Sequence, residues 1–131
     1  MSKVFLGGTC ADTAWRDELC RVLGIDSFDP VVEDWTPECQ RIEEIEKADR
    51  CNIHLYVITD AMQGVFSIAE VIESACTPGK TTILHVMPEG FSKGQLKSLE
   101  AVAVMVRKHG GIAYIDPELA RTARVLNFAF K

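Results

Sequence analysis

The sequence lacks any long apolar run and any Cys-x-x-Cys pair. Without about 20 consecutive apolar residues it offers no transmembrane helix. Met1-Ser2-Lys3 leads into a strand-like segment without a charged leader or a cleavage site, so no secretion signal is predicted. The five cysteines are an odd, scattered set, which favours neither a disulfide framework nor a zinc site. We expect a cytoplasmic protein with buried, reduced thiols and no membrane partner.

Basic residues are also outnumbered, with 14 Lys and Arg against 19 Asp and Glu and a net charge of −5. This balance argues against a duplex nucleic-acid partner, because a phosphate backbone binds cationic surfaces. The glycines form neither the G-x-x-x-x-G-K-[ST] phosphate loop nor the G-x-G-x-x-G dinucleotide fingerprint. We therefore expect a small-molecule ligand, bound without a metal or an organic cofactor.

What is present is an alternation of strand-like and helix-like segments within 131 residues, the size of one domain (1–131). Strands are predicted at Lys3–Leu6, Ser27–Val32, Ile53–Ile58, Thr81–Val86 and Ile112–Ile115. Helices are predicted at Trp15–Leu23 (capped by Asp12 or Thr13), Pro37–Ala48 (capped by Thr36), Ser67–Cys76, Lys93–His109 and Pro117–Asn127. This alternation is typical of an α/β fold, a flavodoxin-like doubly wound sheet of about five parallel strands with helices on both faces.

Ligands of such sheets bind beyond the carboxyl ends of the strands, which here selects the loops Gly7–Trp15, Glu33–Pro37 and Thr59–Ser67. In the first loop, Gly7-Gly8-Thr9 could let the backbone approach a sugar or phosphate, or could simply form a tight turn. Trp15-Arg16 and Asp34-Trp35 combine aromatic and charged groups suited to a nucleobase. Trp15 could equally be a core residue, Arg16 a solvated helix residue and Asp34 an exposed turn residue. His54 and His85 fall within strands and receive no role.

The segment from Asp60 to Glu70 joins the central strand to a helix and places two carboxylates around one loop. Near the helix N-terminus, Glu70 would be favoured in its ionised form, as a carboxylate nucleophile requires. Ser67-x-x-Glu70 is also the pattern of a capping box, in which both side chains only satisfy backbone N–H groups. The residues alone leave both interpretations open.

The ordered combination of several motifs resembles the nucleoside 2-deoxyribosyltransferase-like family. It comprises Lys3-Val-Phe-Leu-Gly-Gly-Thr9, Trp15-Arg16, Pro30-Val-Val-x-Asp34-Trp35, Asp49 and Gly64-x-x-Ser67-x-x-Glu70. The resemblance covers about the first two thirds of the chain. It implies that Glu70 attacks the anomeric carbon of a nucleoside, releases the base and leaves a glycosyl ester. It also implies aspartates that relay a proton to the base, for which Asp49 and Asp60 are the candidates by position.

Two departures from the family pattern concern this chemistry. The transferases place an aspartate a few residues before the nucleophile, where this chain has Gln63-Gly64. They also direct a tyrosine hydroxyl from the first strand toward the nucleophile, where this chain has Phe5 and Leu6. The groups that protonate the base and orient Glu70 are therefore not evident from the sequence.

We expect cleavage or transfer at the N-glycosidic bond of a nucleoside or nucleoside monophosphate. The alternatives are a non-catalytic nucleotide-binding module and a hydrolase of the nicotinamide N-glycosidic bond. The residues expected to contact substrate are Gly7, Gly8, Thr9, Trp15, Arg16, Asp34, Trp35, Gln63, Gly64 and Ser67. The resemblance further implies a homo-oligomer, to whose interface Phe128 and Phe130 of the last helix could contribute.

Overall fold

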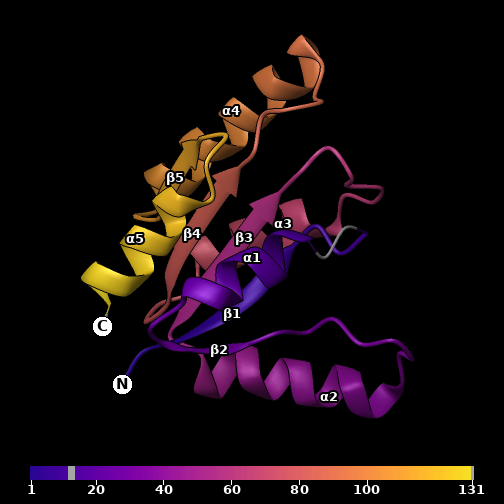
Figure 1. Ribbon diagram of the computed structural model, residues 1–131, viewed down its shortest axis with the longest axis vertical. Helices are drawn as coiled ribbons and strands as arrows, with labels where there is room; N and C mark the ends of the chain where they lie inside the picture. The colour runs from indigo at the N-terminus through magenta and orange to yellow at the C-terminus, as the bar shows by residue number, and fades with distance from the viewer. Residues whose placement is uncertain (12–13, 131) are drawn as a thin grey trace.

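A computed structural model describes residues 1–11 and 14–130, so Asp12 and Thr13 lie outside the described residues. Five parallel strands form one sheet in the order β2-β1-β3-β4-β5 (Figure 1). The strands are β1 (Lys3–Gly8), β2 (Asp26–Phe28), β3 (Ile53–Ile58), β4 (Thr81–Val86) and β5 (Ile112–Ile115). This is the strand order of flavodoxin-like sheets, which confirms the predicted fold class.

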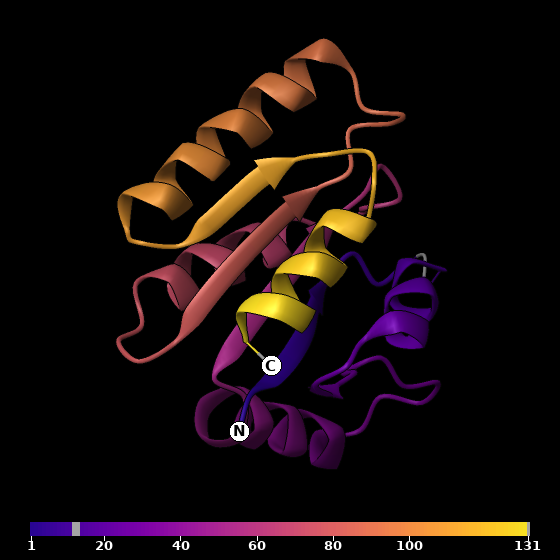
Figure 2. The ribbon, with the colours of Figure 1, turned by 60° about the vertical axis from the view of Figure 1, so that its left-hand side comes forward.

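The helices cover both faces of the sheet, and α5 crosses in front of it in Figure 2 while α3 passes behind. They are α1 (Ala14–Val22), α2 (Pro37–Ile45), the π-helical turn η1 (Glu46–Arg50), α3 (Phe66–Ala75), α4 (Lys93–Lys108) and α5 (Ala120–Ala129). Residues of α1 and α5 pack with one face of the strands, and residues of α3 and α4 pack with the other. The helices that follow β1 and β3 thus leave the sheet on opposite faces, which makes these neighbouring strands the topological switch point.

Most predicted elements are confirmed, and the differences have local causes. β1 continues through Gly7 and Gly8, because both glycines still pair with β3. β2 ends at Phe28, far short of the predicted Val32. Pro30, which lacks an amide donor, follows it. The Thr36 hydroxyl accepts a hydrogen bond from the Cys39 amide at 3.2 Å, so the predicted cap of α2 is confirmed.

Two predictions about side-chain burial are wrong in part. Only Cys51 of the five free cysteines is buried, because Cys10, Cys20 and Cys76 are exposed and Cys39 is half-buried. At the carboxyl end, Phe128 is exposed as expected, whereas Phe130 packs against the core that α1 and α5 share with the sheet.

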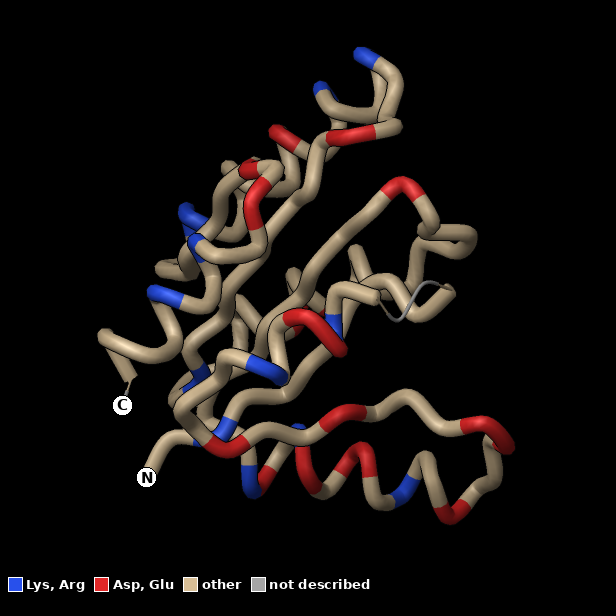
Figure 3. Tube along the Cα trace, viewed as in Figure 1, with Lys and Arg blue, Asp and Glu red and all other residues tan. Residues whose placement is uncertain are grey.

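Charge is unevenly distributed over the surface. Figure 3 shows Asp and Glu concentrated on α2 and the loop before it, while Lys and Arg gather on α4 and α5. None of the helices in the described part of the chain combines the length and apolar character needed to cross a membrane. The acidic helix α2 forms one side of the site described next.

Candidate active site

A cavity of about 940 Å3 lies between α2, η1 and α3, beside the switch-point strands β1 and β3. Polar and charged side chains enter it from both helical sides. The helical side at α2 and η1 contributes Gln40, Glu43, Glu44, Lys47 and Ala48, and the side at α3 contributes Phe66, Ser67, Glu70, Glu73 and Ser74. Phe5, Gly7, Gly8 and His54 line it from the strands. The cavity is therefore where a doubly wound sheet is expected to bind its ligand.

Glu70 is paired with a lysine that the sequence analysis did not identify. The Lys47 ammonium donates to Oε2 of Glu70 at 2.5 Å, and both side chains are about four-fifths buried. Lys47 Nζ also lies 5.4 Å from the centre of the Phe5 ring and 5.8 Å from that of Tyr56. A charge-assisted bond in such partial burial is stronger than one on the open surface. Lys47 thus holds the Glu70 carboxylate at the cavity wall.

The backbone of Lys47 is held by a buried hydrogen-bond chain. His54 Nε2 lies 2.7 Å from the Lys47 carbonyl, which can only accept, so this nitrogen carries the proton. In the neutral ring Nδ1 must then accept from the Ser74 hydroxyl, 2.9 Å away. Because the Ser74 hydroxyl already donates its single proton to His54, the Tyr56 hydroxyl must donate to Ser74 Oγ, which lies 2.7 Å away. This series of hydrogen bonds therefore assigns one donor and one acceptor to each bond. The Tyr56 oxygen remains free to accept a further hydrogen bond.

The pKa shifts agree with this arrangement. Burial lowers the pKa of His54, which keeps the ring neutral. Burial also acts to lower the pKa of Lys47, but Tyr56 and Glu70 outweigh it, and the net shift is upward. Burial raises the pKa of Tyr56, against the opposing effect of Lys47. The network therefore combines a cationic lysine, a neutral histidine and a neutral tyrosine.

The capping-box interpretation of Ser67 and Glu70 is wrong. α3 begins at Phe66, with Val65 as its N-cap and no side-chain capping bond. The Ser67 hydroxyl instead donates to the Gly8 carbonyl at 3.2 Å, and Glu70 is bound to Lys47. Tertiary partners from β1 and η1 have replaced the local pairing that the sequence suggested. Glu70 therefore has no role in helix capping.

Gly7 and Gly8 line the cavity, and each is also required by the packing of β1 on β3. A Cβ at Gly7 would lie 2.8 Å from the Tyr56 ring. At Gly8, where φ is +107°, it would lie 2.2 Å from the Val57 carbonyl oxygen. A larger residue at Gly8 would face both backbone strain and a clash. The glycines thus serve the close approach of the strands that form the cavity floor.

Trp15, Arg16 and Thr9 form a buried cluster at the end of β1. The Arg16 guanidinium donates to the carbonyls of Leu6 at 2.9 Å and Thr9 at 2.6 Å. Trp15 Nε1 donates to the same Thr9 carbonyl at 3.0 Å. Arg16 is 1% exposed, and burial lowers its pKa. Of the three, only Arg16 lines the cavity, and its donors are engaged by backbone carbonyls.

Trp35 and Phe66 are exposed aromatic residues that line the cavity, Trp35 from the loop before α2 and Phe66 from the start of α3. Trp35 is 55% exposed and precedes α2, while Phe66 is 75% exposed and begins α3. Large exposed rings beside a cavity are suited to stack on a flat ligand. The loop position of Trp35 predicts its place at the cavity, whereas no sequence pattern identified Phe66.

The structure brings only part of the predicted residue set to the cavity. Gly7, Gly8, Arg16, Trp35, Ser67 and Glu70 line it. Thr9, Trp15, Asp34, Asp49, Asp60, Gln63 and Gly64 are absent from its lining. Asp60, which follows β3, packs its carboxylate against Gly90, and Asp49 is exposed on η1. Both aspartates are therefore outside the cavity that contains Glu70.

Glu43 and Lys47 also line the cavity but were not among the predicted site residues. Their spacing of four residues on a predicted helix places them on one helical face, a signal that was available. Nothing in the sequence linked that face to Glu70, because the link is made by the crossover from β2 to β3. Within residues 1–11 and 14–130, no group of three or more His, Cys, Asp or Glu side chains could hold a metal ion.

In a comparison with protein-family models, residues 1–91 match the family described as "Nucleoside 2-deoxyribosyltransferase like". The matched region contains β1 to β4, α1, α2, η1 and α3, and hence every element that lines the cavity. Comparisons with curated proteins and with solved structures gave no match.

Proposed function

We propose that this chain, which belongs to the nucleoside 2-deoxyribosyltransferase-like family, cleaves or transfers at the N-glycosidic bond of a nucleoside or nucleoside monophosphate. Glu70 is the nucleophile: a carboxylate oxygen bonds to the anomeric carbon as the bond from that carbon to the base nitrogen breaks. The bonding pair leaves with the base, which takes up a proton. Water or a second base then displaces Glu70 from the glycosyl ester, as in retaining glycosidases.

The observation that carries this proposal is the placement of Glu70. Its carboxylate lines the cavity, four-fifths buried, and makes no capping bond. Lys47 supplies the orienting bond for which the sequence offered no tyrosine on β1. The ionised carboxylate is the form that can attack an anomeric carbon.

The resemblance assigns proton transfer to Asp49 and Asp60, and both assignments can be tested by substitution. Neither residue lines the cavity, so support for them comes from sequence position alone. We expect Asp49→Asn and Asp60→Asn to change base release far less than Glu70→Gln. Loss of activity in either variant would require the segment that carries the substituted aspartate to move toward the cavity.

A second candidate is a nucleotide-binding module without turnover. The observation favouring it is that Lys47 occupies one Glu70 oxygen, which leaves a single oxygen for attack. In that role Glu70 and Lys47 would hydrogen-bond a sugar hydroxyl instead of reacting with it. Such a protein would bind nucleosides and release no base.

The deciding experiment incubates the protein with a panel of nucleosides, their 5′-monophosphates and a nicotinamide dinucleotide, and measures free base by mass. We expect base release by the wild type and at least a ~10³-fold loss in Glu70→Gln, about 4 kcal/mol of barrier, because an amide is a poor nucleophile. Glu100→Gln, an exposed substitution on α4, is the control. Binding without base release would support the second candidate, and release of nicotinamide alone would identify the substrate as a dinucleotide.

We also propose that the chain forms a homo-oligomer. Phe128 on α5 is 84% exposed and could be covered by a second copy. Light scattering of the wild type and of Phe128→Ser at micromolar concentration tests this, and a monomer in both would contradict it.

A further inference from the structure

We propose that Glu43 is the general acid that protonates the leaving base. The inference rests on the proposed function of Glu70 and adds a group that the family resemblance does not assign. A proton donor is needed because neither Asp49 nor Asp60, the donors that the resemblance implies, lines the cavity.

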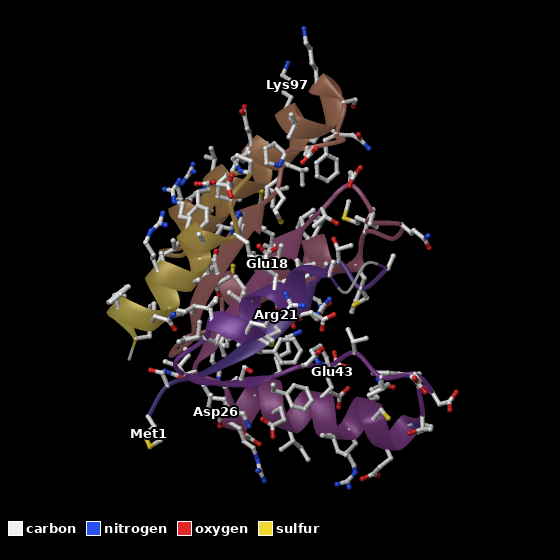
Figure 4. All side chains as sticks on the ribbon, viewed as in Figure 1. Met1, Glu18, Arg21, Asp26, Glu43 and Lys97 are labelled. Atoms are coloured by element: carbon white, nitrogen blue, oxygen red, sulfur yellow. The ribbon has the colours of Figure 1, made fainter. Side chains whose placement is uncertain are left out.

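The placement of Glu43 on α2 is the first ground for this role. Glu43 lines the cavity from α2, whereas Glu70 lines it from α3, so two carboxyl groups enter one cavity from different helices. Figure 4 labels Glu43 on α2. Lys47, one turn further along the same helical face, contacts Glu70, which brings that face close to the nucleophile. Two carboxyl groups at one cavity are what a displacement at an anomeric carbon requires.

The environments of these two carboxyl groups differ. Within the described residues the Glu43 carboxyl group has no hydrogen bond or ion pair, whereas the Glu70 carboxylate is bound by Lys47. Burial raises the pKa of Glu43, and the nearby charges of Glu70 and Glu44 raise it further against the opposing effect of Lys47. Two carboxyl groups in different environments can take different roles in one reaction, one as the ionised nucleophile and the other as the proton donor. Glu44, which accepts from Gln40 and is exposed, lacks this environment.

As Glu70 bonds to the anomeric carbon and the carbon–nitrogen bond breaks, the carboxyl proton of Glu43 passes to a ring nitrogen of the base. The base leaves neutral and Glu43 is left as a carboxylate. In the second half-reaction this carboxylate takes a proton from the incoming water or base, which attacks the glycosyl ester and frees Glu70.

The test compares two substrates that differ in their need for an acid. A 2′-deoxynucleoside requires protonation of its base, whereas p-nitrophenyl 2-deoxyriboside releases a stable phenolate without it. We expect Glu43→Gln to lose about 10²- to 10⁴-fold in kcat/KM on the nucleoside and less than about 10-fold on the nitrophenyl substrate. In the wild type, kcat/KM on the nucleoside should fall at alkaline pH as the general acid loses its proton. In Glu43→Gln this dependence on pH should be weaker. Glu38→Gln, on the same helix but outside the cavity lining, is the matched control.

Glu70→Gln separates the two proposals, because it should lose activity on both substrates. Equal losses in Glu43→Gln on both substrates, or full activity on the nucleoside, would overturn the role of Glu43 while leaving Glu70 in place. A wild-type protein that releases neither base nor nitrophenol would overturn both. Thermal unfolding of each variant shows whether a loss reflects misfolding instead of chemistry.

Discussion

Lys47 Nζ lies 2.5 Å from Oε2 of Glu70, and this contact connects η1 with α3 across the cavity. The lysine is itself fixed at two points, by His54 at its backbone carbonyl and by Glu70 at its ammonium. A side chain held in this way can keep the nucleophile in one orientation, a large part of what catalysis requires. Lys47 is therefore a positioning residue for Glu70.

Lys47→Met should retain most of the apolar stem while removing the ammonium. A hydrogen bond to a charged group is worth about 1.5–3 kcal/mol, so we expect kcat to fall roughly 10- to 100-fold with a smaller change in KM. Steady-state kinetics measures both, and Lys97→Met on exposed α4 is the control. Unchanged kcat in Lys47→Met would show that Glu70 needs no such partner.

The two tryptophans should respond oppositely to truncation. Trp35→Ala should weaken nucleoside binding and leave the thermal midpoint nearly unchanged, because Trp35 is 55% exposed beside the cavity. Trp15→Ala should cost about 3–5 kcal/mol of stability, since Trp15 is buried and donates to Thr9. Calorimetry and ligand titration together test the pair. A destabilised Trp35→Ala with normal binding would contradict the stacking role.

Nucleosides should be preferred to their 5′-monophosphates. The cations that line the cavity within the described residues are Arg16, Lys47 and Lys80, and each is already engaged. The carboxylates of Glu44, Glu70 and Glu73 line the same cavity and would repel a phosphate. We expect kcat/KM to be higher for the nucleoside by about tenfold, roughly 1.4 kcal/mol, and the difference to shrink with added salt. A monophosphate preference would require Arg16 to release its carbonyl partners.

Stability should decrease as the pH falls from about 7.5 to 6. Burial lowers the pKa of both His54 and His85 in the folded protein. The unfolded chain therefore binds more protons in this window, so the free energy of unfolding declines with acidification. His85 is held by Thr122 and Asp116, as His54 is by Ser74 and Lys47. Thermal midpoints measured across this pH range test the prediction. His109→Gln, at an exposed position, should leave the change of the midpoint with pH unaltered, and His85→Gln should reduce it.

The strands were predictable where burial on both faces gives an unbroken apolar run between clear breaks. β3, β4 and β5 have the predicted bounds, whereas the edge strand β2 is shorter than its pattern suggested. Local rules failed at α3, where Ser67 and Glu70 form bonds with β1 and η1 in place of a capping box. A pattern of residues close in sequence, such as a capping box, cannot predict hydrogen bonds to residues of other helices and strands.

The site was predictable only in its nucleophile candidate and in several residues at its rim. Glu70, Trp35 and the two β1 glycines were found from loop position and family pattern. Glu43 and Lys47 were not, because their function depends on how the β2–β3 crossover places one helical face beside α3. The predicted cluster of Trp15 and Arg16 was located correctly at the end of β1, but its polar groups face backbone carbonyls.

The widened turn η1 makes the site sensitive to chain length as well as to residue type. The Cys51 amide donates to the Glu46 carbonyl at 2.7 Å, five residues earlier, so the turn contains one residue more than an α-helical turn would. Deleting one residue between Lys47 and Cys51 would allow an ordinary α-helical turn to form there. Each residue of an α-helix spans about 100° of rotation, so the face carrying Glu43 and Lys47 would turn away from α3. Among relatives, a one-residue gap here would therefore mark chains that keep the fold and Glu70 but have lost the opposing side of the site.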